Sequence, residues 1–180
     1  TLMLGWFKGA HDVGMYGAAQ RPILLLYALP ALFATSLFPL FSKYAFVNKE
    51  KFKNILEVSL TLSLAAVLPI VAGGVIVARP LILLLYGGEY DSASIAFGVL
   101  LFTLPVVFPS FIIGDAIVAY NGQRTFFLFS TIGAVGDIIL NLFLIPTYGI
   151  MGAAVSTVAA QLITNVVIWY KLKRFNEFQV

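Results

Sequence analysis

The sequence predicts an all-α membrane protein, a polytopic bundle of transmembrane helices. Of the 180 residues, 61% are hydrophobic and only 11% are charged, and the mean hydropathy is +0.98. Soluble domains are roughly half apolar and about a quarter charged, so this chain has too few charges to cover a surface in water. Long apolar segments also recur between short polar links, and the alternating segments of ~10 residues that build a membrane barrel are not seen.

The first segments follow from apolar length and from prolines. Residues 1–8 are expected to end a preceding helix, and an apolar helix with Pro30 and Pro39 in its interior follows. The next helix cannot continue to Tyr86, because residues 55–86 would span ~48 Å against ~30 Å of hydrocarbon. We therefore expect Arg79 and Pro80 to mark a membrane face, with Leu81–Tyr86 lying along the interface.

The last two segments form a hairpin. Pro146 is expected to stop one helix, and Gly149 and Gly152 to allow a tight reversal without any charge in the turn. The predicted crossings are 12–41, 55–78, 93–120, 126–145 and 153–170.

The distribution of cations predicts the orientation. Of the 11 Lys and Arg residues, eight fall on the side of the 42–54 link, the 121–125 loop and the tail after residue 170. By the positive-inside rule that side is cytoplasmic, and the protein is a multi-pass protein of the cell (plasma) membrane. The net charge of +3 thus reflects topology, and no nucleic-acid partner is expected.

One acid stands near mid-membrane. Asp137 lies about eleven residues into its helix, ~16 Å deep by helical rise, and shares a face with Ser130, Gly133 and Asn141 through three- and four-residue steps. An ionised acid there costs at least a few kcal/mol unless it meets water, a cation or a partner. Asp137 either lines a cavity that binds a proton, a cation or sugar hydroxyls, or is a protonated acid hydrogen-bonded to a neighbouring helix.

Other polar residues allow two interpretations each. Gln161 and Asn165 share a stripe with Thr157 and Thr164, and could pack between helices or contact sugar hydroxyls. Asp115 could bind a coupling ion, but interfacial water or a contact with Arg124 is the simpler interpretation. The candidate cavity residues also include Arg21, whose guanidinium suits a diphosphate or reaches to lipid headgroups.

The sequence gives little support for enzyme chemistry. His11 is the only histidine and there is no cysteine, so no metal site and no cofactor are expected. The predicted outer loops hold few side chains for acid–base catalysis beyond Arg79, Glu89 and Asp91. Interior prolines in three helices fit a transporter that bends between conformations.

The order of several motifs is similar to a known family. The matching stretches are DVGMYGAAQR (12–21), SLFPLFSKY (36–44), RPLILLLYGGEYDSA (79–93), AYNGQR (119–124) and NLFLIPTYGIMGAAVST (141–157). Together they resemble the later half of polysaccharide flippases, the Wzx-like polysaccharide biosynthesis proteins of the multidrug/oligosaccharidyl-lipid/polysaccharide exporter superfamily.

The resemblance implies the second lobe of a two-lobe MATE-like transporter fold, with the N-terminal lobe absent from this chain. It implies alternating access that moves a lipid-linked oligosaccharide or polysaccharide precursor to the outer leaflet, with a proton or sodium as a possible coupling ion. The partners would be membrane lipid, that substrate and the N-terminal lobe of the same polypeptide. The alternatives are a multidrug/cation antiporter of the same superfamily, a membrane enzyme such as a glycosyltransferase, and a structural subunit without a cavity.

Overall fold

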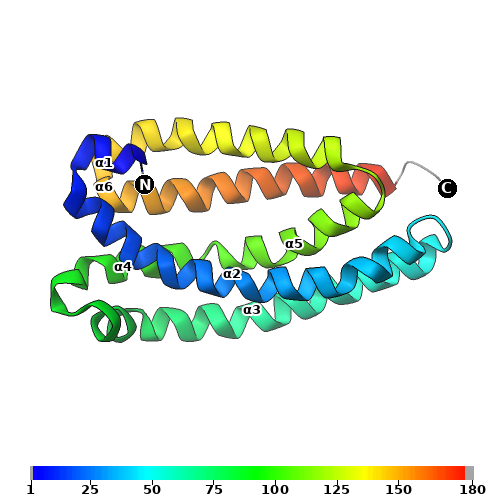
Figure 1. Ribbon diagram of the computed structural model, residues 1–180, viewed down its shortest axis with the longest axis horizontal. Coiled ribbons are helices and arrows are strands. Elements are labelled where there is room, and N and C mark those ends of the chain that lie inside the picture. Colours follow the sequence, from blue (N-terminus) through cyan, green and yellow to red (C-terminus); the bar gives the residue numbers. More distant parts are fainter. Residues whose placement is uncertain (1, 177–180) are drawn as a thin grey trace.

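The computed structural model describes residues 2–176, apart from the side chains of residues 125, 129 and 169–176, and this part of the chain is almost entirely helical. Figure 1 shows α2 and α3 side by side along the molecule, with α6 folded back on itself above them. The elements are α1 (Leu2–Lys8), α2 (Ala10–Tyr44), α3 (Lys49–Tyr86), the short 3₁₀ helix η1 (Gly88–Tyr90), α4 (Asp91–Leu101), α5 (Leu104–Ala119) and α6 (Gln123–Asn176).

The helices have the length and composition of membrane spans, which confirms the predicted fold class. Three are long and apolar enough to cross a bilayer: α2, α3 and residues 126–168 of α6. A fourth span is possible if α4 and α5, which meet at an angle of 46°, count as one. α6 reverses direction part-way along its length. Each of its two arms is by itself long enough to cross ~30 Å of hydrocarbon at ~1.5 Å per residue.

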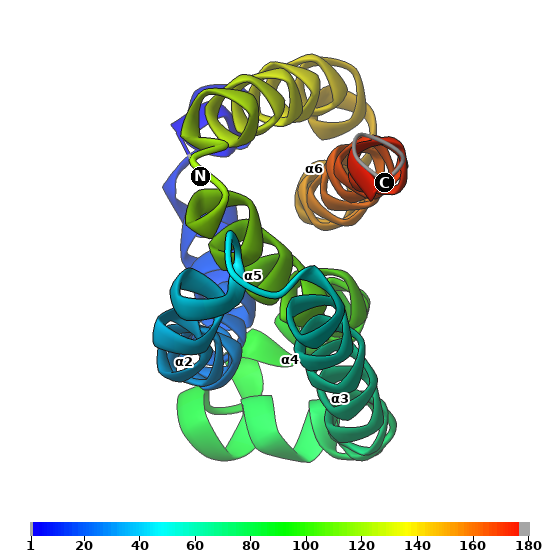
Figure 2. The ribbon, with the colours of Figure 1, turned by 90° about the vertical axis from the view of Figure 1, so that its right-hand side faces the viewer.

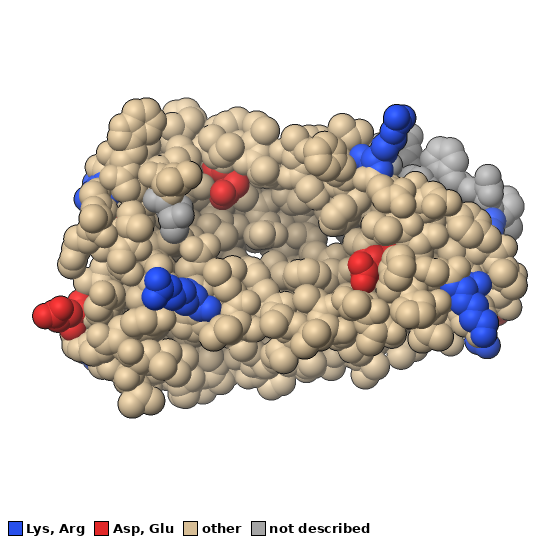
Figure 3. All heavy atoms as spheres, viewed as in Figure 1, with Lys and Arg blue, Asp and Glu red and all other residues tan. Residues whose placement is uncertain are grey.

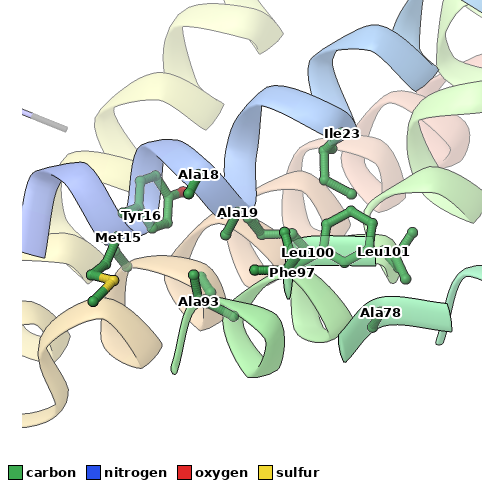
Figure 4. Packing of buried hydrophobic residues seen from close by; sticks show 14 of the residues in the cluster. Met15, Tyr16, Ala18, Ala19, Ile23, Ala78, Ala93, Phe97, Leu100 and Leu101 are labelled. Atoms are coloured by element: carbon green, nitrogen blue, oxygen red, sulfur yellow. The ribbon is translucent and has the colours of Figure 1, made fainter. Parts of the chain in front are cut away.

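The main core lies where α2, α3, α4 and the turn of α6 meet. Ala19 of α2 lies beside Phe97 and Leu100 of α4, and all three are at most 2% exposed (Figure 4). Small residues such as Ala19 and Ala96 let helix backbones approach closely, which is the main source of helix association in lipid.

The end of α3 differs from the sequence prediction. The helix does not stop at Arg79 but continues through Pro80 to Tyr86, and Gly87, with φ of 87°, ends it. The last turns are held by tertiary contacts, since Ala78 and Ile82 belong to the main core. The expectation that residues 81–86 leave the helix was therefore wrong, because packing outweighs the local cost of a proline.

The predicted 93–120 helix is broken. Residues 102 and 103 separate α4 from α5, because Pro105 has no N–H and its ring clashes with the carbonyl four residues earlier. Thr103 is fully buried at the break, where its hydroxyl accepts a hydrogen bond from Tyr27 of α2 at 2.7 Å and donates to the carbonyl of Leu100 at 2.6 Å. Polar groups freed at the break are thereby satisfied inside the bundle.

The reversal in α6 occurs at Gly149, which has φ of 56° and ψ of −127°. Figure 2 shows the two arms as separate helices, which we call the first arm (residues 123–148) and the second arm (residues 150–176). The sequence predicts that Pro146 stops the first helix of the hairpin. This prediction is wrong, since the first arm continues past Pro146 to Tyr148. At Gly152 a Cβ would collide with the carbonyl of Leu144, so a residue without a side chain is required where the second arm leaves the turn.

The surface is that of a protein surrounded by lipid. Large apolar side chains such as Leu25, Ile76 and Leu84 are 76–83% exposed, a pattern that is unfavourable in water. Figure 3 shows a face with only scattered charged side chains and a hollow in its middle. The chain is thus an integral membrane protein.

Candidate functional site

The polar stripes of the two α6 arms face each other across one pocket. The first arm contributes Ser130, Gly133 and Asp137, three residues that recur at helical spacing and therefore share a face. The second arm contributes Thr157, Gln161 and Thr164. They enclose a pocket of about 300 Å³, whose full lining is Ser130, Gly133, Ala134, Asp137, Thr157, Ala160, Gln161 and Thr164.

The arms lie in close contact at Gly133, within the lining of this pocket. A Cβ on Gly133 would overlap the hydroxyl oxygen of Thr164, and would also lie 2.9 Å from its methyl group. No real side chain tolerates such contacts, so the closeness of the arms depends on glycine here. At Gly136, one turn further, a Cβ would meet nothing within 4 Å. The close contact of the arms is therefore specific to Gly133 and is not shared by Gly136.

Asp137 carries an unpaired oxygen. Its Oδ1 is buried and has no hydrogen-bond partner among the described residues. The side chain of Asn141 donates to the backbone carbonyl of Asp137 at 2.8 Å, one helical turn away, and leaves that carboxyl oxygen unsatisfied. A buried polar atom without a partner costs free energy, and such an atom can be satisfied by water, an ion, a proton or a ligand. Asp137 is therefore the group in this pocket best suited to recognise a ligand.

Tyr16 of α2 contacts the pocket lining through Thr157, a contact that sequence reasoning missed. Its hydroxyl lies 3.1 Å from Oγ1 of Thr157, the ring is 3% exposed, and it is within electrostatic reach of Asp137. No local pattern distinguishes this tyrosine from others in apolar segments. Only the packing of α2 against α6 brings it to the pocket, so it could not be found from spacing along the chain.

Four of the expected site residues do not line this pocket. Asn165 is engaged between helices: its side chain accepts a hydrogen bond from Ser110 of α5 and donates to the carbonyl of Gln161 at 2.8 Å. Asn141 is turned to the backbone of its own helix. Asp115 is half-buried on α5 and forms no ion pair with Arg124, and Arg21 is exposed on α2.

The lining combines hydroxyl, amide and carboxyl groups within an apolar bundle. Such groups can hydrogen-bond the hydroxyls of a sugar, or share a proton or a monovalent cation. No group of three or more His, Cys, Asp or Glu side chains that could hold a metal ion occurs in the described part of the chain. The pocket is thus chemically suited to binding polar groups.

Comparison with known proteins identifies the family. The lipid II flippase MurJ family matches residues 19–179, nearly the whole chain. The chain belongs to this family. The resemblance inferred from the motifs is therefore confirmed in part: the chain belongs to a family of flippases for lipid-linked substrates, and the family that matches is MurJ, whereas the Wzx-like assignment itself is not confirmed.

Two curated relatives come from Haloferax volcanii. The probable flippase AglR is 31% identical over 171 residues, which cover 92% of this chain and 36% of AglR. The probable low-salt glycan biosynthesis flippase Agl15 is 26% identical over 174 residues, covering 96% of this chain and 37% of Agl15. The chain therefore spans just over a third of the length of these relatives.

A solved structure has the same fold. The lipid II flippase MurJ in an inward closed conformation superimposes with a TM-score of 0.82 at 21% identity, over 95% of this chain and 38% of that protein. At this identity the likeness establishes the fold, which is that of a MurJ-type membrane bundle.

Proposed function

We propose that this chain is the C-terminal lobe of a flippase that moves a polyprenyl-linked oligosaccharide from the inner to the outer leaflet. The observation that carries the proposal is the polar pocket between the α6 arms, in a chain of the MurJ family. A flippase must carry a hydrophilic head through ~30 Å of hydrocarbon while the lipid tail stays in the bilayer. A polar surface inside an apolar bundle lowers the cost of that passage.

In this proposal the site residues have different roles. Asp137 and Gln161 line the pocket and offer a carboxylate and an amide to sugar hydroxyls or to a coupling proton or sodium ion. Arg21, exposed on α2, is suited to the diphosphate of the carrier because its guanidinium matches phosphate geometry. Asn141 and Asn165 support the helices around the pocket through their hydrogen bonds, and Asp115 lies outside it.

The proposed cycle is alternating access between two lobes, with the N-terminal lobe of the same polypeptide as partner. The break between α4 and α5 and the interior prolines of α2 and α3 supply places where the bundle can bend. The tail is proposed to lie in the cytoplasm and the protein in the cell membrane, since the basic links lie on the tail side.

The test is transfer of a fluorescent polyprenyl-diphosphate oligosaccharide between the leaflets of proteoliposomes that contain the complete polypeptide. We expect transfer by the unaltered protein and at least a tenfold slower rate for Asp137→Asn, which removes the charge and keeps the shape. Asp115→Asn is the matched control, because it removes a carboxylate outside the pocket.

Each outcome has a clear meaning. An unchanged rate in Asp137→Asn would remove Asp137 from the mechanism while the flippase remains. Absence of transfer, together with efflux of a cationic dye driven by a cation gradient, would favour the antiporter. That second function has one observation in its favour, the unpartnered carboxyl oxygen of Asp137.

A further inference from the structure

A group of basic and aromatic side chains lies at the junction of α2 and α3, far from the pocket in sequence. Lys43 and Tyr44 end α2, and Lys51 lies in the first turn of α3. The ammonium of Lys51 is 4.7 Å from the centre of the Tyr44 ring, and that of Lys43 is 5.4 Å from it. One ring thus gathers two cations that would otherwise repel each other. We call Lys43, Tyr44 and Lys51 the lysine–tyrosine cluster.

The junction that carries this cluster is well ordered by its own contacts. The side chain of Asn48 caps α3 by accepting a hydrogen bond from the backbone N–H of Lys51 at 2.9 Å. Phe46 packs edge-on against Tyr120 at 5.6 Å between ring centres, and Ala45 is fully buried. The two cations are therefore held near the ring by a fixed backbone.

The lysines near the junction differ in whether they are paired with an acid. A shallow pocket is lined by both signs, with Glu50 and Glu57 beside Lys51 and Lys53, and the ammonium of Lys53 lies 3.8 Å from the Glu57 carboxylate. Lys43 and Lys51 form no ion pair with any acid in the described part of the chain. The two cations at Tyr44 thus have no directly paired acid, although Glu50 lines the same shallow pocket as Lys51.

The depth of the cluster matches the lipid headgroups. If the hydrocarbon ends near Phe41 and Ile55, helical rise places Lys43 ~3 Å and Lys51 ~6 Å beyond it. The headgroup layer occupies roughly 5–8 Å on each side of the bilayer. Both ammonium groups thus lie within reach of lipid phosphates.

We propose that the lysine–tyrosine cluster is a binding site for the headgroup of an acidic phospholipid. The two ammonium groups over the Tyr44 ring contact the phosphate and the tyrosine holds them in place. The charge of the site, rather than its apolar surface, selects the lipid, so zwitterionic phospholipids bind more weakly. This site lies outside the pocket between the α6 arms and does not depend on the proposed transport.

The chain itself permits a direct test, since it contains no cysteine. A fluorophore attached to Ser42→Cys, an exposed position beside Lys43, reports on neighbouring lipids in bilayer nanodiscs. We compare quenching by spin-labelled phosphatidylglycerol with quenching by spin-labelled phosphatidylcholine at equal mole fraction. Preference for phosphatidylglycerol is expected, and Lys51→Gln is expected to weaken it by about fivefold, the scale for one basic residue at an acidic surface.

Two controls distinguish a specific lipid-binding site from non-specific electrostatic attraction of acidic lipids. Lys53→Gln removes the same charge two residues away, but its ammonium is already paired with Glu57, so a clearly smaller loss is expected. Tyr44→Leu keeps every charge and is expected to weaken the preference, whereas Tyr44→Phe retains the ring and the preference. Equal losses for Lys51→Gln and Lys53→Gln, no effect of Tyr44→Leu, or no preference in the parent would each overturn the proposal. Circular dichroism of each variant confirms that the helices are intact.

Discussion

At the scale of single residues, the shape of the pocket depends on one glycine. Gly133 has no Cβ, and this allows the hydroxyl of Thr164 to occupy the space that a side chain would need. Gly133 and Thr164 both line the pocket that also contains Asp137. A small change at Gly133 is therefore expected to act on both stability and the pocket.

Gly133→Ala is expected to destabilise the protein by about 1–3 kcal/mol, the usual range for overpacking. Gly136→Ala is the matched control, since a Cβ there meets nothing within 4 Å and alanine is the better helix former. Unfolding in detergent followed by circular dichroism measures both. Adding Thr164→Ala should restore part of the stability of Gly133→Ala, and equal stability of the two glycine variants would contradict the close contact.

At the scale of elements, the arrangement of α6 follows from its turn. Gly149 adopts backbone angles that are essentially restricted to glycine, and this reversal places the two polar stripes opposite each other. Pro146, three residues earlier, lies within the helix and does not determine the turn. The pocket therefore depends on Gly149 more than on the proline that first draws attention in the sequence.

Gly149→Ala is expected to cost about 1–3 kcal/mol, because a Cβ strains the backbone at these angles. Pro146→Ala should be tolerated or mildly stabilising, since it restores an N–H donor to a residue already in the helix. The measurement is the midpoint temperature of unfolding of the two variants beside the parent protein. A larger loss from Pro146→Ala than from Gly149→Ala would show that the turn is set by the proline.

The sequence predicts the elements better than their ends. Apolar length identifies the long helices, and three- and four-residue spacing identifies the stripes that contain Asp137 and Gln161, because both signals are local. The extension of α3 past Pro80 depends on core contacts of Ile82, and the contact of Tyr16 with Thr157 joins residues 141 positions apart. Such interactions exist only after the helices have packed, so no local pattern contains them.

At the scale of the whole molecule, the distribution of cations predicts one orientation in the membrane. The junction of α2 and α3 and the loop between α5 and α6 lie on the side with most Lys and Arg residues, whereas η1 lies on the other side. Basic residues near the ends of spans are retained on the cytoplasmic side.

Single cysteines test this orientation, because this chain has none of its own and any cysteine elsewhere in the complete polypeptide can be replaced beforehand. We expect a membrane-impermeant maleimide to label Glu89→Cys in intact cells, and to label Ser42→Cys and Asn121→Cys only after the membrane is made permeable. All three positions are in or beside exposed segments, so labelling reports the side rather than burial. Labelling of Ser42→Cys in intact cells would reverse the proposed orientation.

The continuous helix α3 is longer than the hydrocarbon layer of the bilayer is thick. The apolar stretch from Ile55 to Tyr86 is ~48 Å long as a helix, against ~30 Å of hydrocarbon. Such an excess is accommodated by tilting the helix, by stretching the lipids around it, or by letting its last turns emerge. Because Ile82 ties the end of α3 to the core, a change in tilt would move α2 and α4 with it. The length of the lipid acyl chains is therefore expected to set the tilt of the bundle. Thick membranes favour an upright bundle and thin membranes an inclined one.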